Sequence, residues 1–312
     1  MSEAPQGADA DDEVTDEEPW HLARTTADVV RLALGTDAAR LIAHDPIARL
    51  GADPEGVHQA RVATRRLRSH LGTFAAVLRA KPSKRLSRQL RDLGRILGTA
   101  RDLDVMSGRF ELEVAEFEPM YRDDGVALLG LLASERAAAH DALRRFLSSK
   151  KHRELLGRLG AFVADPPLRG RAGAPPEDAL LEVIHRRYDT LDAAIEALPA
   201  TPPDVLLHEV RIIAKPARYA AEIGAPVLGQ ACRRLAKRLA DLSDDLGSLN
   251  DGARANEWLD GAGEDPSMEF AVALVRAQEI ERMVEARAEW PRQWQRVRIA
   301  AAEMGWIDAP PI

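Results

Sequence analysis

One motif occurs twice in this 312-residue chain, and its two copies lie 150 residues apart. Each copy has a histidine followed by three basic residues at helical spacing: His58, Arg61, Arg65 and Arg68, then His208, Arg211, Lys215 and Arg218. A second match follows at an offset of 149 residues, because residues 84–102 align with residues 233–251 and share leucines at equivalent positions. Two matches at nearly the same offset indicate an internal duplication, so the chain is predicted to fold as two homologous halves.

The composition and the spacing of apolar residues predict an all-α fold. Alanine, leucine and arginine dominate, aromatic residues make up only 4%, and no segment sustains strict alternation. The first half is expected to hold helices over 54–78, from Pro82 to a C-cap at Gly98, onward from an N-cap at Asp102, and over 123–147. The second half is expected to repeat them from residue 203, with breaks at 224–229 and at Gly247. Short connections predict an antiparallel bundle of about four helices in each half.

A stretch rich in proline and glycine, residues 165–179, separates the two halves. The predicted organisation is an acidic tail (1–19), a first helical half (20–164), a linker (165–179) and a second helical half (180–312). The tail holds eight acidic residues, no basic residue and few apolar ones, so it is expected to be disordered. Without those eight, 42 of the 50 acidic residues remain against 43 Lys and Arg. A local basic face is therefore compatible with the formal net charge of -7.

The single cysteine and the lengths of the apolar segments indicate in which cellular compartment the protein is expected. Cys232 is the only cysteine, so no intramolecular disulfide bond is expected, as is typical of a reducing compartment. The N-terminus lacks the apolar stretch of a signal peptide. The longest apolar run, residues 126–133, is far shorter than the roughly 20 residues that cross a bilayer. A soluble, cytoplasmic protein without a membrane partner is expected.

Both copies of the motif place their basic residues on one face of a helix. At about 100° per residue, the first basic row (His58, Arg61, Arg65 and Arg68) occupies a stripe of about 80°, opposite Leu67 and Leu71. The second basic row (His208, Arg211, Lys215 and Arg218) is arranged in the same way. The next helix repeats the pattern, with the Lys84 row (Lys84, Arg88, Arg91 and Arg95) opposite its leucines. None of the positions that define the first and second rows is acidic, which indicates an anionic partner.

The second half is expected to be less basic than the first. Its counterpart of the Lys84 row keeps Arg233 and Lys237 but has Ala240 and Asp244 at the positions of Arg91 and Arg95. Pro216 lies within the second basic row and is expected to kink that helix or to start it anew, because proline removes an amide donor.

The first basic row is about 15 Å long, which suits an extended polyanion better than one phosphate. One guanidinium group can donate hydrogen bonds to two phosphate oxygens at once, so the enrichment in arginine favours a phosphate ligand. Tyr219 is the only aromatic residue near the rows, so base stacking is poorly supported and a phosphate polymer without bases fits best. The main alternative function is that of a nucleic-acid-binding helical protein. The simplest explanation of the basic face is that it binds no ligand and is either solvated or paired with acidic residues of the same chain.

The motifs that carry these rows resemble a known family. The segments "VHQARVATRRLRSHLGTF", "LGTARDLDV", "HEVRIIAKPARYAAEI" and "DLGSLND" are similar to the CHAD domain, the conserved histidine α-helical domain, from about Trp20 to the C-terminus. The resemblance implies two four-helix bundles related by pseudo-twofold symmetry around a basic central channel. It also implies binding of inorganic polyphosphate and, in some members, location on polyphosphate granules. Carried onto this chain, the binding positions are His58, Arg61, Arg65, Arg68, Lys84, Arg88, Arg91, His208, Arg211, Lys215, Arg218, Arg233 and Lys237.

The sequence favours a binding protein that has no cofactor and is not an enzyme. Many relatives carry a catalytic CYTH domain, but only the short tail precedes Trp20, so triphosphatase activity is not expected. No Walker loop, metal-ligand cluster or Ser-His-Asp set is present. Asp102 and Asp104 could hold a metal, although helix capping and a salt bridge to arginine explain them more simply.

Two further features have competing explanations. The segment at His208 faintly resembles the phosphorylation box of histidine kinases, but Ile212 and Ile213 stand where that box requires Thr-Pro. A phosphoacceptor histidine is therefore a minor alternative. Trp290 and Trp294, one helical turn apart, are expected to pack in the core of the last helix.

Overall fold

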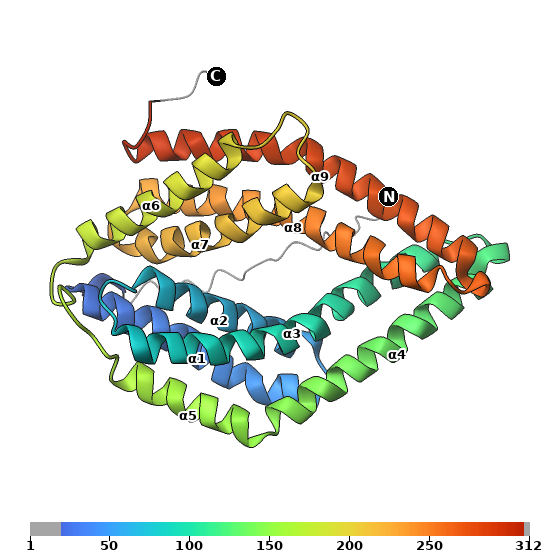
Figure 1. The fold of residues 1–312 in the computed structure, drawn as a ribbon, viewed down its shortest axis with the longest axis horizontal. Helices are drawn as coiled ribbons and strands as arrows, with labels where there is room; N and C mark the ends of the chain where they lie inside the picture. Colours follow the sequence, from blue (N-terminus) through green and yellow to red (C-terminus); the bar gives the residue numbers. More distant parts are fainter. Residues whose placement is uncertain (1–19, 309–312) are drawn as a thin grey trace. The chain divides into compact units, whose positions relative to one another are not determined.

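The computed structural model describes residues 20–308 and contains only helices as regular structure within that range (Figure 1). Nine α-helices and three short 3-10 helices are present there, and the one bridge between extended residues joins Leu78 and Leu168. The predicted all-α fold is confirmed. The predicted acidic tail lies outside the described residues.

The described chain forms two compact units. The N-terminal unit comprises Thr25–Ala174 and Asp251–Met283, and the C-terminal unit comprises residues 20–24, Pro175–Asn250 and residues 284–308. Helices α8 and α9 therefore pass from one unit into the other. This division differs from the predicted one, in which residues 180–312 form a single half.

The N-terminal unit is built on five complete helices, and α3 runs on from the α1–α2 pair until the chain turns back into α4 (Figure 1). A capping box between Thr25 and Asp28 starts α1, and Gly51, at φ 71°, ends it. The bounds are α1 Thr26–Leu50, α2 Pro54–Thr73, α3 Ala80–Ala115, η2 Pro119–Tyr121, α4 Arg122–Leu147, α5 Lys150–Ala164 and η3 Pro266–Met268.

The far end of α3 explains why residues 251–283 belong to this unit. Phe110 of α3 and Leu128 of α4 are buried with Leu259 of α8 and Val275 of α9 in one hydrophobic cluster. Burying these side chains together stabilises the ends of four helices that are distant in sequence. Core packing, rather than the boundary of the sequence repeat, sets the extent of the unit.

The C-terminal unit holds the remaining helical segments. Its Tyr188 stacks on Trp294 with ring centroids 5.9 Å apart, and Trp290 is buried as well. The prediction that both tryptophans pack in the core is confirmed. The bounds are η1 Trp20–Leu22, α6 Pro176–Glu196, α7 Asp204–Leu228, α8 Gln230–Ala262 and α9 Glu269–Glu303.

Several predicted helix ends are wrong. Helix α3 continues through Gly98 and Asp102, and α8 continues through Gly247. In α3 the buried face extends beyond Leu97 to Ala100 and Phe110, so its packing outweighs the roughly 1 kcal/mol cost of a helical glycine. Near the start of α3, Pro82 lies in the first turn, where a missing amide donor costs little, and α2 ends at Thr73 rather than at residue 78.

Pro216 does not start a new helix, because α7 runs without interruption from Asp204 to Leu228 and also includes Pro226. The helix ends at Gly229, whose φ is 80°. This break lies within the predicted one at residues 224–229. Buried alanines along α7, such as Ala214, Ala217 and Ala221, hold the helix in place on both sides of the proline.

The proline- and glycine-rich segment between the units packs on the N-terminal unit. The Arg169 guanidinium donates to the carbonyl oxygens of Leu78 and Ala75 at 2.8 and 3.2 Å. Backbone amides at the start of α1 donate to the carbonyls of Ala172 and Ala174. The segment is thus a strap fixed by hydrogen bonds. None of the described helices is long and apolar enough to span a membrane.

Candidate polyanion-binding site

Helix α2 separates the first basic row from an apolar face, as the sequence predicts. Asp53 caps the helix by accepting from the amide of Glu55, and Pro54 opens the first turn. Leu67 and Leu71 are buried on one side. On the other side, the members of the first basic row are all only partly exposed: His58, Arg61, Arg65 and Arg68.

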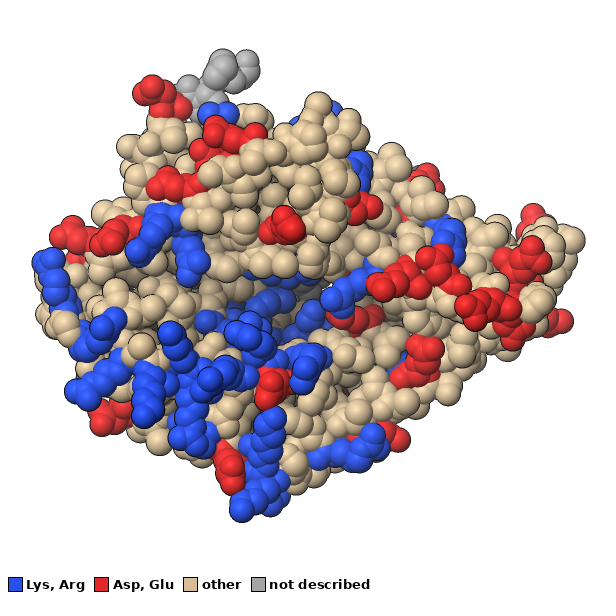
Figure 2. Space-filling view, viewed as in Figure 1, with Lys and Arg blue, Asp and Glu red and all other residues tan. Residues whose placement is uncertain are grey.

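Helix α3 presents a second basic surface. The leucines of its seam, Leu86, Leu90, Leu93 and Leu97, are fully buried. Opposite them Lys84, Arg88 and Arg91 are exposed and form no salt bridge within the part of the chain that the structure describes. Figure 2 shows basic side chains gathered over α3 and the neighbouring α5.

Two glycines allow α2 and α3 to approach closely. A Cβ atom added at Gly94 would lie 3.3 Å from Cγ2 of Thr64, which is tighter than ordinary van der Waals contact. One turn later, a Cβ atom at Gly98 would lie 3.8 Å from the Arg61 guanidinium. The glycine that the sequence suggests as a helix cap therefore faces an arginine of the first basic row. The close approach sets that row beside the Lys84 row.

Arg68 and Arg91 show that positive charge in this region is not fully balanced. Burial and, secondarily, the nearby Arg91 lower the pKa of Arg68, and no acidic residue contributes to its shift. The Nε atom of Arg68 is buried and has no hydrogen-bond partner within residues 20–308. Like charges held together in this way cost free energy unless an anion joins them.

Asp92, an acidic residue on α3, reports the same excess of positive charge. A 2.8 Å hydrogen bond from Lys151 of α5 holds the pKa of Asp92 below its ordinary value, and attraction by Arg95 and Arg91 adds to the effect. One carboxylate thus lies in the field of three cations. Lys151 was not among the predicted site residues, and no periodic pattern in the sequence links it to α3.

Arg61 differs from Arg68 because it has an acidic partner. Its guanidinium donates to Asp102 of α3 at 3.3 Å, and Arg254 of α8 pairs with the same carboxylate. Next to it, Asp104 accepts from Arg136 at 2.6 Å and pairs with His140 at 2.8 Å. These aspartates therefore form salt bridges, while the alternative capping role is wrong. The described residues contain no cluster of three or more side chains suited to a metal ion.

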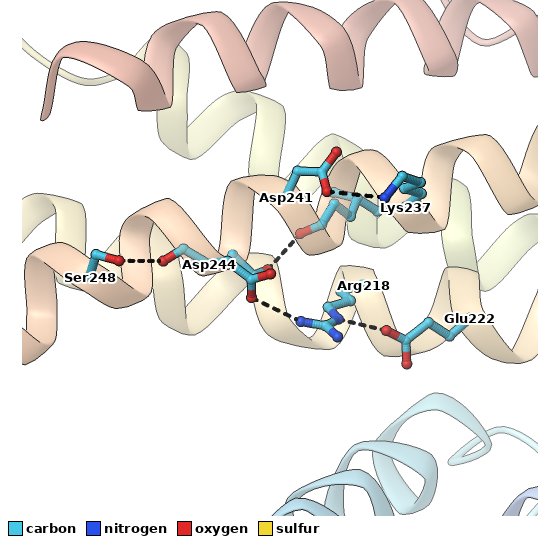
Figure 3. A network of polar contacts seen from close by, with 8 residues as sticks. Arg218, Glu222, Lys237, Asp241, Asp244 and Ser248 are labelled. Carbon is cyan, nitrogen blue, oxygen red and sulfur yellow. Dashed lines mark hydrogen bonds and ion pairs between the residues drawn. The ribbon is translucent and has the colours of Figure 1, made fainter. Parts of the chain in front are cut away.

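The second basic row, in the C-terminal unit, is partly neutralised (Figure 3). Arg218 is buried and donates to Glu222 at 2.6 Å and to Asp244 at 3.3 Å. Burial alone would lower the pKa of Arg218, but Glu222, followed by Tyr219 and Asp244, outweighs burial and raises the pKa above its ordinary value. The four positions of the row hold no acidic residue, but acidic partners come from outside it: Glu222, one turn further along α7, and Asp244 on α8. The four-residue spacing from Arg218 to Glu222 was a signal of this pairing in the sequence.

The remaining predicted residues of this unit have mixed surroundings. Lys237 is exposed, and its Nζ atom lies 3.7 Å from Oδ1 of Asp241. Nδ1 of His208 lies 2.6 Å from Oδ1 of Asn250. Arg211 and Lys215 are partly exposed on α7, and Arg233 is exposed on α8. Among the predicted site residues, those that form no salt bridge within residues 20–308 include Arg68, Lys84, Arg88 and Arg91, and all four lie in the N-terminal unit.

Comparison with known families identifies the fold. The model of the CHAD domain family matches residues 32–260. The protein belongs to the CHAD domain family. Its match covers both basic rows and most of the helices described above.

Related chains and structures agree with the assignment to the CHAD family. Two uncharacterized proteins of Mycobacterium tuberculosis, MT2285 of strain CDC 1551 and Rv2226 of strain H37Rv, are each 30% identical over 261 residues. This match covers 81% of the present chain, which spans 50% of the length of each relative.

Two solved structures share the fold of this CHAD protein. PptA from Streptomyces chartreusis has a TM-score of 0.73 at 20% identity, over 88% of this chain and 100% of its own. The CHAD domain from the plant Ricinus communis has a TM-score of 0.72 at 24% identity, over 88% of this chain and 92% of its own.

Proposed function

We propose that this CHAD protein binds inorganic polyphosphate on the basic face of its N-terminal unit without turning it over. The observation that carries the proposal is the exposed row of Lys84, Arg88 and Arg91 on α3, which form no salt bridge among residues 20–308. Arg68 of α2 lies close enough to Arg91 for the two guanidinium groups to repel each other. A chain of phosphates placed along α2 and α3 would replace this repulsion with attraction. The family resemblance, which implies polyphosphate as the ligand, points in the same direction.

The dimensions of the face favour a polymer. From Lys84 to Arg95 the Lys84 row extends over about 16 Å of helix, which exceeds the reach of a single phosphate group. Arginine supplies most of the cations and can hold phosphate oxygens in pairs. Several neighbouring phosphates are needed to satisfy such a row at once.

The same face is poorly suited to reading nucleic acid. Phe110 is the only Phe, Tyr or Trp on α2 and α3, and it is fully buried, so neither helix offers a ring on which a base could stack. Tyr219, beside the second basic row in the C-terminal unit, is only 2% exposed as well. Nucleic acid would therefore bind through its phosphates alone, at a lower charge density than polyphosphate has. Weak, non-specific binding to RNA is the expected limit.

Competition with RNA tests the choice of ligand. Labelled linear polyphosphate of defined length is bound to the full chain, and unlabelled polyphosphate or RNA of equal total charge is added. Polyphosphate is expected to displace the label at far lower concentration. Equal displacement by RNA would instead favour the nucleic-acid-binding alternative.

Turnover is tested in the same samples. The described residues offer no metal cluster, and Asp102 and Asp104 are engaged in salt bridges. Incubation with polyphosphate should therefore release no orthophosphate above the rate in buffer. Release that is abolished by changing Asp102 or Asp104 would show that the protein is an enzyme.

The proposal also predicts where the protein is found. Polyphosphate collects in granules in some cells, and the family resemblance implies such a location for some members. A fluorescent fusion should therefore gather on cytoplasmic polyphosphate granules. It should disperse when Arg68 and Arg91 are both replaced by alanine.

A further inference from the structure

The first half of α9 has two apolar faces. Its inner face, with Ala271, Val272 and Val275, is buried in the hydrophobic cluster shared with α3, α4 and α8. A second set of apolar residues, which we call the α9 stripe, faces solvent: Phe270, Ala273, Leu274, Ala277 and Ile280. One apolar face suffices to attach a helix to a core, so the second needs another explanation.

The α9 stripe is continuous along the helix. At about 100° per residue its five members fall within about 120°, on the side opposite the buried face. The three large side chains are exposed by 57% at Phe270, 36% at Leu274 and 50% at Ile280. Single exposed apolar residues are common on protein surfaces, but a run at the three- and four-residue spacing of a helix–helix seam indicates a binding surface.

Helix η2 extends this surface at one end. The ring of Tyr121 lies 5.4 Å from that of Phe270, centroid to centroid. The neighbouring Met120 is 72% exposed. Between the large residues, Ala273 and Ala277 leave room for a second helix axis at the usual distance of about 8–10 Å.

The surroundings of the α9 stripe are acidic. Figure 2 shows acidic side chains gathered over the end of the N-terminal unit where α3, α4 and the start of α9 meet. One basic residue beside the stripe, Arg276, is engaged by Asp260 at 2.7 Å. The exposed acidic residues of these segments include Glu116, Glu118, Asp123, Glu257, Glu269 and Glu281, and they outnumber exposed basic residues such as Arg122.

We infer that the α9 stripe is a docking surface for a basic amphipathic helix of a partner protein. The partner's apolar residues would cover the stripe, and its lysines and arginines would meet the acidic rim. The charge excludes other occupants. Phosphate polymers and anionic membranes are repelled, and a second copy bound stripe to stripe would bring Glu269 and Glu281 of one copy close to the same acidic residues of the other. This inference does not depend on polyphosphate binding.

A synthetic peptide tests the inference directly. The probe is a fluorescent helical peptide of about 18 residues, or five turns, with leucines at three- and four-residue spacing and lysines elsewhere. The full chain is expected to bind it in an anisotropy titration at about 0.15 M salt, and more weakly as salt rises. Two control peptides, one with glutamate in place of lysine and one with serine in place of leucine, are expected to bind far less.

Variants of the α9 stripe then locate the binding. Phe270→Ala with Ile280→Ala should weaken binding of the leucine–lysine peptide by about tenfold or more, because central apolar anchors dominate such interfaces. Glu281→Lys should weaken it as well. Matched controls are Ile42→Ala on α1, an apolar residue with 51% exposure, and Glu154→Lys on α5, and both should bind like the unchanged protein.

Two results would overturn the inference. One is equal peptide affinity for the stripe variants and the controls, with circular dichroism showing that all variants are folded. The other is a dimer, seen by sedimentation, that the stripe variants dissociate while the peptide binds none of the proteins. Polyphosphate affinity should stay unchanged in the stripe variants, which separates this inference from the proposed function.

Discussion

Arg61 of α2 donates to Asp102 of α3 across the contact between the two helices, with 3.3 Å from Nη2 to Oδ1. The same carboxylate also pairs with Arg254 of α8. One acidic residue therefore holds two arginines at the edge of the basic face. A bound polyanion must compete with Asp102 for both guanidinium groups.

Replacing Asp102 with asparagine should strengthen polyphosphate binding. The change removes the competing charge while keeping a side chain of the same shape. Since Asp102 is partly exposed, we expect a gain of about two- to fivefold, which corresponds to a partly exposed ion pair of roughly 0.4–1 kcal/mol. Titration with polyphosphate of one defined length measures the effect. Asp123→Asn on α4 is the control, and an equal gain in that variant would mean that only the net charge matters.

Arg68→Ala and Arg91→Ala should each weaken polyphosphate binding by roughly tenfold or more. A hydrogen bond to a charged group contributes about 1.5–3 kcal/mol, which corresponds to that change in affinity. Either variant also removes a like-charge repulsion, which offsets part of the packing lost at the partly buried Arg68, so both variants should remain folded by circular dichroism. Arg145→Ala, on the exposed side of α4, is the matched control. Unchanged affinity in folded Arg68 and Arg91 variants would place the site elsewhere.

Cys232 should be unreactive until the protein unfolds. Burial raises the pKa of its thiol to about 12, so almost no thiolate exists in the folded state at pH 8. A disulfide reagent such as DTNB should react slowly with the native protein and promptly in denaturant. The folded pKa is the higher one, so stability should fall once the pH passes the unfolded value near 8.5–9. Prompt reaction under native conditions would contradict this.

The sequence was sufficient to predict the helical class and both faces of α2 and α3. Each feature depends on periodicity within one segment, as Leu86, Leu90 and Leu93 opposite Lys84 illustrate. Helix ends were harder to predict. Gly98 and Gly247 resemble helix C-caps in the local sequence, but α3 and α8 continue through them because the residues on both sides pack in the core.

The charge partners were harder still to predict. Asp102 pairs with Arg61 of the preceding helix and with Arg254, which is 152 residues away. Separations of this length produce no periodic pattern in the sequence from which the pairs could be predicted. Glu222 is different, because it follows Arg218 by one turn on the same helix face. That spacing could have shown in advance that Arg218 has a structural partner.

Arg218→Ala should therefore affect stability more than binding. Arg218 is buried between Glu222 and Asp244, and its loss leaves two carboxylates without their cation. We expect the free energy of unfolding to fall by roughly 1–3 kcal/mol in urea titrations. Adding Glu222→Ala should recover part of this loss, and the double-mutant cycle measures the pair. Polyphosphate affinity should change less than in Arg68→Ala, because the Arg218 guanidinium is already engaged by acidic groups. A loss of binding equal to that of Arg68→Ala, without loss of stability, would instead place Arg218 in the polyphosphate site.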